Sequence, residues 1–262
     1  MHRLTREVRF AINDGNDPQL SLQPSNGYGG FPSITGYGPF MSIEVTLSGA
    51  IDPVSSYLIN IKQIDAAVRE RAIPVVAEAV LSTQEAPARL VGRLYELMAA
   101  WPPLTLERLA LNLSPFLSYS TQVSEQPMIR VSQKFEFSAT HRLHNPKASE
   151  AENSKIFGKC NNPHGHGHNY EVQVTLKGEP DGNGVLMAVP EFERIVGQTV
   201  IEKFDHKNLN VEMREFAELI PTVENIAMVI YRMLKPKFSP GHAGLASVTV
   251  WETPKTWCEY SE

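Results

Sequence analysis

The sequence has little of what would assign it to a membrane class or to a disulfide-stabilised secreted class. It has 2 cysteines among 262 residues, which is too few for a disulfide framework and is typical of a reducing compartment. No apolar run approaches the 18 or so consecutive residues of a membrane span. Charged residues interrupt the first ten positions, where a signal peptide would be apolar. We therefore expect a cytoplasmic protein that has no membrane partner.

Basic residues are also in the minority, with 24 Lys and Arg against 29 Asp and Glu and a formal net charge of −5. A nucleic-acid-binding protein generally needs a basic face to neutralise phosphates, so this balance argues against that class. The hydrophobic content of 42% is that of a globular chain with one large core or two small ones. An anionic substrate would have to be held by a local basic cluster.

Reactive side chains are concentrated in the second half of the chain. His2 is the only histidine before residue 128, and all the other histidines and both cysteines follow that point. We therefore expect catalytic or metal chemistry in the second half.

A short internal repeat relates the two halves. Residues 43–49 (IEVTLSG) match residues 172–178 (VQVTLKG), and helical periodicity follows each copy. The helices are expected over 62–81 and 88–100 in the first half, and over 190–204 and 223–235 in the second, where Thr222 is a candidate cap. Alternating residues at 109–113 and 248–252 predict a closing strand in each half.

These patterns predict an α+β protein of two tandem units, each an antiparallel four-stranded sheet with two helices on one face. We place the first unit at residues 1–122 and the second at residues 128–262. The polar stretch 120–127, which ends in Pro127, is the expected linker.

The strongest motif is FGKCNNPHGHGHNY at residues 157–170, which opens a predicted strand. Residues two apart on a strand share a face, so His166 and His168 can present their imidazoles to one metal ion. His164 and His166 have the same spacing, but the strand proper begins just after His168, which favours the later pair. A hairpin partner over 134–141 would bring His141 as a third ligand, and three histidines with an open position are typical of a catalytic zinc. The alternative is a glycine-rich turn with solvated histidines.

Four other residues could carry chemistry, and each has a structural alternative. Cys160 lies six residues before His166, where its thiolate could act as a base or nucleophile, or it could be a small buried hydrophobe. Asp205 and His206 could form an acid/base relay or end a helix. Glu252 lies on a mostly apolar strand and needs hydrogen-bond donors, from a ligand with paired N–H groups or from a salt bridge.

Together these residues resemble one family. The segments FSATHRL, FGKCNNPHGHGHNYEVQVTLKGEPDGNG, DHKNLN, PTVEN and WETP, spread over about residues 130–262, are similar to 6-pyruvoyl-tetrahydropterin synthase and more broadly to the pterin synthases. The resemblance implies a tunnelling fold and the substrate 7,8-dihydroneopterin triphosphate. It also implies Zn(II) bound by His141, His166 and His168, Cys160 as catalytic cysteine, Asp205 and His206 as acid/base pair, and Glu252 as anchor of the pterin ring.

The family builds stacked rings of three units, so the resemblance implies a homo-oligomer, and a trimer of tandem chains would keep active units together. Candidate residues for holding the triphosphate are Arg142, Lys155, Lys159 and Lys207.

Two other functions share these residues. One is 6-carboxy-tetrahydropterin synthase of deazaguanine synthesis, whose cysteine is typically separated from the HGH motif by three residues. Here Cys160 and His166 are separated by five, as in the pyruvoyl type, but His164 also satisfies the shorter spacing. The other is a noncatalytic pterin-binding protein, which the complete set of ligands, thiol and relay disfavours.

The first half is expected to be a degenerate, noncatalytic copy. Alignment on the shared VTL segment puts Phe31 at Cys160, Tyr37 at His166 and Pro39 at His168. With small gaps, Asp14 falls near His141, Ala77 and Glu78 near Asp205 and His206, and Leu113 at Glu252.

Overall fold

The computed structural model describes residues 1–13, 24–238 and 243–262. The chain divides into two compact units. The first contains Met1–Val131 and Lys177–Leu186, and the second contains Ser132–Leu176 and Met187–Glu262. Among the described residues, no helix is both long and apolar enough to cross a membrane.

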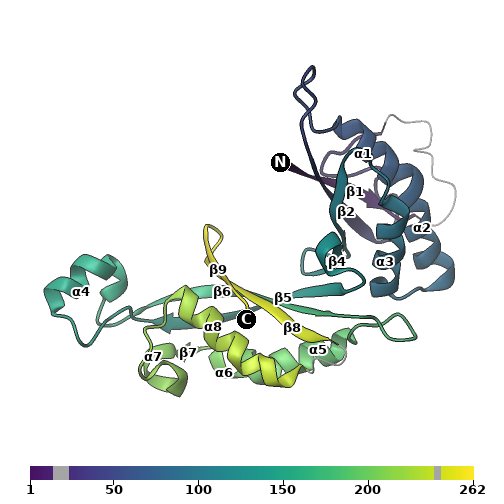
Figure 1. The fold of residues 1–262 in the computed structure, drawn as a ribbon. Coiled ribbons are helices and arrows are strands. Elements are labelled where there is room, and N and C mark those ends of the chain that lie inside the picture. The colour runs from purple at the N-terminus through teal and green to yellow at the C-terminus, as the bar shows by residue number, and fades with distance from the viewer. Residues whose placement is uncertain (14–23, 239–242) are drawn as a thin grey trace. The chain divides into compact units, whose positions relative to one another are not determined.

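The first unit contains an antiparallel sheet in the order β1-β2-β3-β4. Its strands are β1 (His2–Ala11), β2 (Phe40–Gly49), β3 (Thr105–Asn112) and β4 (Leu117–Gln122) (Figure 1). Alternate residues of β2 (Met41, Ile43, Val45 and Leu47) are buried toward the helices, as the period of a strand requires.

The α- and π-helices of the first unit form two runs, and a short 3-10 helix, η4 (Val123–Glu125), follows β4. The first run is α1 (Ile61–Ala67), the π-helix η2 (Val68–Ala72), α2 (Ile73–Glu78) and the π-helix η3 (Ala79–Thr83), and the second is α3 (Pro87–Met98). The Asn60 side chain caps α1 by accepting from Lys62 N. The buried face of α3 includes Leu90, Leu94 and Met98, so α3 covers the sheet with an apolar stripe.

The second unit has strand order β5-β6-β8-β9, with β5 (Ile129–His141), β6 (His166–Gly178), β8 (Gly244–Thr253) and β9 (Thr256–Tyr260). The first residues of β5 and the last residues of β6 belong to the first compact unit. The contacts Ser132–Thr175 and Ser138–Asn169 run in opposite directions along β5 and β6, as antiparallel pairing requires.

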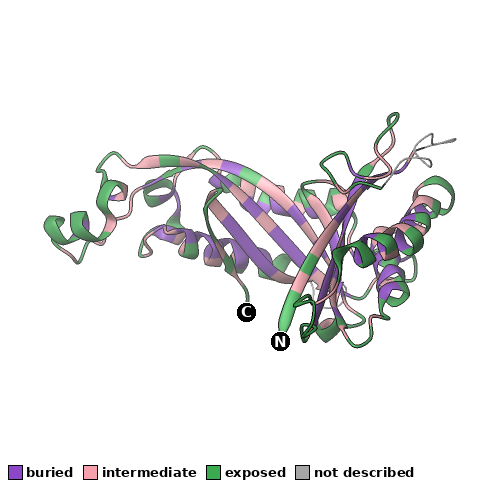
Figure 2. Cartoon of the chain, turned by 90° about the horizontal axis from the view of Figure 1, so that it is seen from above, coloured by how far each residue is buried: buried purple, intermediate pink, exposed green. Residues whose placement is uncertain are grey.

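A two-residue strand, β7 (Lys207–Asn208), pairs in parallel with β5. The helices of the second unit are, in chain order, α4 (Glu150–Phe157), η5 (Gly158–Asn161), α5 (Val189–Val196), η6 (Gly197–Ile201), α6 (Glu202–Phe204), α7 (Leu209–Glu212), η7 (Arg214–Phe216), α8 (Val223–Leu234) and η8 (Lys235–Lys237). The core includes Phe137, whose ring stacks on Tyr170 and lies 5.2 Å from that of Phe204. Figure 2 shows buried residues along the strands and exposed residues on the outer side of the helices.

The predicted α+β class and the predicted helices and strands are confirmed, including the Thr222 cap, which accepts from Asn225 N. The predicted linker is wrong at its start. Ser120, Thr121 and Gln122 lie in β4 and pair with Ala110, Leu109 and Arg108. Short hydroxyl and amide side chains are typical of a loop in sequence, but here Ser120 and Thr121 are buried in β4, where pairing with β3 satisfies their backbone groups.

Candidate metal centre and active site

Three histidines from two strands converge in the second unit. His141 ends β5, and His166 and His168 begin β6. Each offers a ring nitrogen, and the three nitrogens lie within 4.8 Å of one another. The ring centroids are 4.5 Å apart for His141 and His166, 5.3 Å for His141 and His168, and 4.9 Å for His166 and His168. The structure thus joins the later pair of the HGHGH run to His141.

His141 is held in one tautomer. Its side chain is fully buried, and Nδ1 lies 2.7 Å from the carbonyl oxygen of Pro221. A carbonyl only accepts, so Nδ1 carries the proton and the Nε2 lone pair is available to a metal. Burial lowers the pKa of His141 to about 4, and burial also lowers the pKa of His166. Both rings are therefore kept neutral, as metal ligands must be.

The nitrogen positions fit a metal ion. His141 Nε2 and His166 Nε2 are 3.0 Å apart, and ligand nitrogens around a tetrahedral zinc, at about 2.0–2.1 Å from the ion, lie roughly 3.3 Å from one another. His168 Nε2 is buried and has no hydrogen-bond partner among the described residues. A buried nitrogen without a partner costs free energy, and a metal ion bound between the rings would remove that cost.

Glu252 of β8 faces the same group of histidines. Its Oε1 lies 3.4 Å from His141 Nε2 and 3.7 Å from His168 Nε2. The carboxylate can therefore balance the charge of a bound cation and also accept hydrogen bonds from a ligand at the site.

Two residues that contact the histidine group were not predicted from the sequence. Pro221 acts through its backbone carbonyl, which leaves no signal in the sequence. Tyr170 is fully buried, and its hydroxyl lies 3.4 Å from His141 Nδ1. Burial raises the pKa of Tyr170, so its hydroxyl stays protonated. The alternation that pairs His166 with His168 also places Tyr170 on the same face.

Cys160 lies in η5, next to the end of β5. Its carbonyl oxygen accepts a hydrogen bond of 2.9 Å from Leu143 N, two residues after His141. Its thiol is partly exposed and forms no disulfide.

Asp205 and His206 form a pair beside Ser138 of β5, three residues before His141. Asp205 Oδ1 accepts from Ser138 N at 2.9 Å, and Asp205 Oδ2 lies 2.8 Å from His206 Nδ1. The hydrogen bond from Ser138 N is the main cause of the lowered pKa of Asp205. His206 has a φ of 59° and its side chain is 83% exposed.

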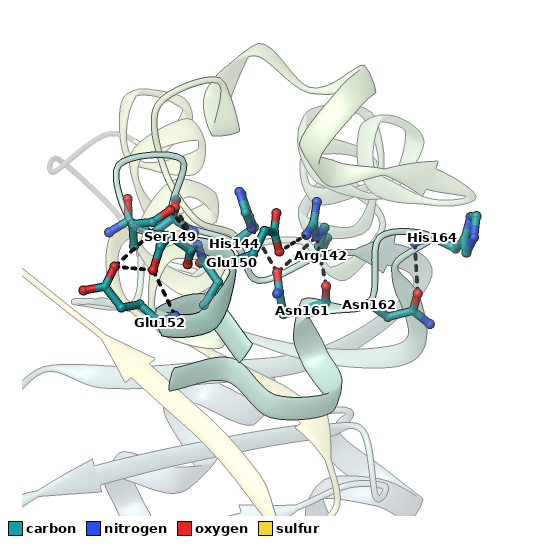
Figure 3. Close-up of polar contacts among 11 residues, drawn as sticks. Arg142, His144, Ser149, Glu150, Glu152, Asn161, Asn162 and His164 are labelled. Carbon is teal, nitrogen blue, oxygen red and sulfur yellow. Dashed lines mark hydrogen bonds and ion pairs between the residues drawn. The ribbon is translucent and has the colours of Figure 1, made fainter. Parts of the chain in front are cut away.

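His164 lies outside the histidine group. It is exposed, and its backbone N–H donates to Asn162 Oδ1 at 3.0 Å (Figure 3). Together with Arg142 and His144 it lines a cavity of about 390 Å³, whose wall includes residues 216–220, directly before the carbonyl of Pro221. Of the other basic candidates, Lys207 pairs with Glu212 at 2.9 Å, whereas Lys155 and Lys159 are exposed.

Comparison with known proteins identifies relatives of the second half. The family model described as 6-pyruvoyl tetrahydropterin synthase matches residues 130–262, just over half of the chain. The 6-pyruvoyl tetrahydrobiopterin synthase of Drosophila melanogaster is 38% identical over 139 residues, covering 53% of this chain and 82% of that protein. The protein of the same name from Homo sapiens is 42% identical over 125 residues, covering 47% of this chain and 85% of its own. A solved structure of Caenorhabditis elegans 6-pyruvoyl tetrahydropterin synthase is 37% identical, covers 52% of this chain and 96% of that chain, and superposes with a TM-score of 0.49.

Proposed function

The chain belongs to the 6-pyruvoyl tetrahydropterin synthase family, and we propose that its second half converts 7,8-dihydroneopterin triphosphate to 6-pyruvoyl-tetrahydropterin with elimination of triphosphate. The observation that carries the proposal is the convergence of three histidine ring nitrogens within 4.8 Å of one another, with the carboxylate of Glu252 beside them. We propose Zn(II) as the metal, because an all-histidine set with an open position suits a catalytic zinc.

His141, His166 and His168 would hold the zinc ion. When bound, zinc supplies Lewis acidity toward the hydroxyl groups of the substrate's side chain. Pro221 keeps His141 in the tautomer that can bind, and the carboxylate of Glu252 faces the space beside the ring nitrogens. Glu252 is proposed to accept the paired N–H groups at the guanidine-like edge of the pterin, which orients the ring.

Cys160 is proposed to act as the base that removes a proton from the carbon next to a side-chain hydroxyl. Its backbone is fixed two residues from the metal ligand His141, through the bond from Leu143 N. A thiol in this position can reach a substrate held at the metal centre. Transfer of a second proton completes the loss of triphosphate and the tautomerisation of the side chain.

Asp205 and His206 are proposed to transfer that second proton. Asp205 accepts from Ser138 N and orients His206 through Nδ1, so the other ring nitrogen points outward as donor or acceptor. Because this ring is exposed, we propose that it serves the site of a neighbouring unit in a homo-oligomer, formed as a trimer of chains. A mass measurement that gives only a monomer would contradict the trimer.

The first half is proposed to be noncatalytic. Tyr37 and Pro39, aligned with His166 and His168, precede β2, whereas the histidines lie within β6. Tyr37 is fully exposed, and Asp14 lies outside the described residues. The histidine group of the second unit is the single candidate metal cluster in the described part of the chain.

The pyruvoyl product is favoured over the carboxy product. Because His166 joins the histidine group and His164 does not, the spacing that applies is the five residues between Cys160 and His166, as in the pyruvoyl type. The relatives from Drosophila melanogaster and Homo sapiens also carry the pyruvoyl name.

The two cysteines provide a matched test of this function. We expect zinc-loaded wild-type protein to release triphosphate from dihydroneopterin triphosphate, and Cys160→Ala to lose the activity by at least about 10²-fold. Cys258→Ala, on β9, is the control and should keep wild-type turnover. Full turnover by Cys160→Ala would remove the assignment of Cys160 as base, and no release by the zinc-loaded wild type would contradict the function.

A further inference from the structure

We infer that Arg142 and His144 are positioning residues, which hold Cys160 at a fixed place relative to the metal ligand His141 by binding Asn161 (Figure 3). The inference rests on the proposed function, in which Cys160 is the base. It changes the expectation for Arg142, which the sequence suggested as a triphosphate ligand.

Asn161 is the centre of this arrangement. It follows Cys160 directly and is only 7% exposed. Arg142 Nε donates to its carbonyl oxygen at 3.0 Å and lies 3.2 Å from its Oδ1. His144 Nδ1 lies 3.0 Å from the same Oδ1. Because Oδ1 is an acceptor, Arg142 Nε and His144 Nδ1 both act as donors. The segment that carries Cys160 is therefore held by two side chains from the residues that follow β5.

The donors come from consecutive residues that directly follow the metal ligand. Arg142 and His144 are two apart and reach the same residue, as side chains on one face of an extended segment do. Leu143, between them, donates its N–H to the Cys160 carbonyl at 2.9 Å. The link from the metal centre to the thiol is therefore a three-residue segment with a hydrogen bond at each residue.

Arg142 is itself held by contacts of both its backbone and its side chain. Its backbone N–H donates to Asn210 Oδ1 at 2.7 Å, and its carbonyl accepts from Asn210 Nδ2 at 2.9 Å. Its guanidinium, 24% exposed, lies 3.7 Å from Glu150. A guanidinium that already binds Asn161 and faces a carboxylate is better suited to holding the loop than to receiving a triphosphate.

This geometry predicts a specific kinetic effect. An error of about 1 Å in the placement of a reacting group can cost about 10²-fold in rate. Loss of the Arg142 or His144 contact should therefore lower kcat and leave KM and metal content unchanged, because neither residue binds the substrate or the metal.

The test uses the full-length, zinc-loaded protein carrying Cys258→Ser, so that Cys160 is the sole thiol. In this background Arg142→Lys keeps the charge but loses the planar Nε–H, and we expect kcat to fall by about 10²-fold with KM within twofold. His144→Asn keeps an N–H donor near the position of Nδ1 and should stay within about threefold of the parent, whereas His144→Leu should lose about tenfold. Lys147→Ala, in the same segment and exposed, is the control.

A second measurement does not depend on turnover. We expect iodoacetamide to alkylate Cys160 several times faster in Arg142→Lys and His144→Leu than in the parent, because the loop is released, with no acceleration in His144→Asn or Lys147→Ala. Three results would overturn the inference. The alkylation rate could be unchanged, the loss of activity could follow metal content alone, or KM could rise at constant kcat, which would indicate a substrate contact instead. If the parent turns over no pterin substrate while alkylation responds as expected, the proposed function fails and the positioning role of Arg142 and His144 stands.

Discussion

The imidazole of His141 and the carbonyl of Pro221 are joined by a 2.7 Å contact across 80 residues of sequence. Because this contact fixes the proton on Nδ1, it directs the Nε2 lone pair toward His166 and Glu252. The segment that precedes α8 thus orients His141 at the end of β5, and the arrangement of the three histidines depends on the packing of this segment against the sheet.

Removing this ring should remove the metal. We predict that His141→Ala lowers bound zinc from about one ion per chain to a small fraction, since two histidines hold zinc far more weakly than three. The measurement is metal analysis after dialysis against a weak chelator. His2→Ala, an exposed histidine on β1, should keep its metal, and full zinc content in His141→Ala would rule out this site.

Glu252 should matter for catalysis through its charge. Glu252→Gln keeps the shape but removes the carboxylate that faces His141 and His168, and we expect kcat/KM to fall by about 10²-fold or more. Steady-state kinetics compare it with Glu259→Gln on β9, whose exposed side chain accepts from Ser247 and Thr249. Equal activity in the two variants would contradict a role for Glu252 at the site.

The Asp205–His206 pair should act through orientation of the ring. Asp205→Asn removes the carboxylate that accepts from Ser138 N–H and faces His206 Nδ1, so we predict a fall in kcat of about 10²-fold. The matched control is Glu212→Gln, a nearby carboxylate that pairs with Lys207 and should keep near-normal turnover. If both variants behave like wild type, the pair has no part in proton transfer.

The first unit contains a carboxylate whose contribution to stability depends on pH. Glu125 accepts from Arg130 at 2.7 and 2.6 Å and from Lys177 at 3.0 Å, and these hydrogen bonds, that of Arg130 foremost, lower the pKa of Glu125 to about 2. The folded state thus favours the charged form, so the stabilisation is present above the ordinary Glu pKa of 4.5 and is lost as pH falls toward 2.

We predict that Glu125→Gln lowers the free energy of unfolding by about 2 kcal/mol at pH 7 and by much less near pH 3. Denaturant unfolding at the two pH values measures the difference. Glu136→Gln, an exposed residue on β5, serves as control and should cost little at either pH. A Glu125→Gln penalty that is the same at pH 7 and pH 3 would contradict the assignment.

The sequence predicted features that depend on local periodicity. The two-residue spacing of His166 and His168 placed both rings on one face, and the hairpin partner brought His141 to them. Features built by long-range backbone contacts were not predictable. The Pro221 carbonyl, the contacts of Arg142 with Asn161 and the parallel pairing of β7 with β5 depend on tertiary packing. The error at Ser120 has a related cause, since the pairing of β4 with β3 makes this polar stretch a strand, and that pairing is not visible in the local sequence.

The proposed reaction is tested most directly by incubating zinc-loaded protein with dihydroneopterin triphosphate, identifying the products by mass spectrometry and assaying acetaldehyde in parallel. We predict that the product has lost triphosphate, keeps its carbon skeleton and has the mass of 6-pyruvoyl-tetrahydropterin. No acetaldehyde is expected. A 6-carboxy pterin accompanied by acetaldehyde would contradict the pyruvoyl assignment, and unchanged substrate would contradict the enzymatic function.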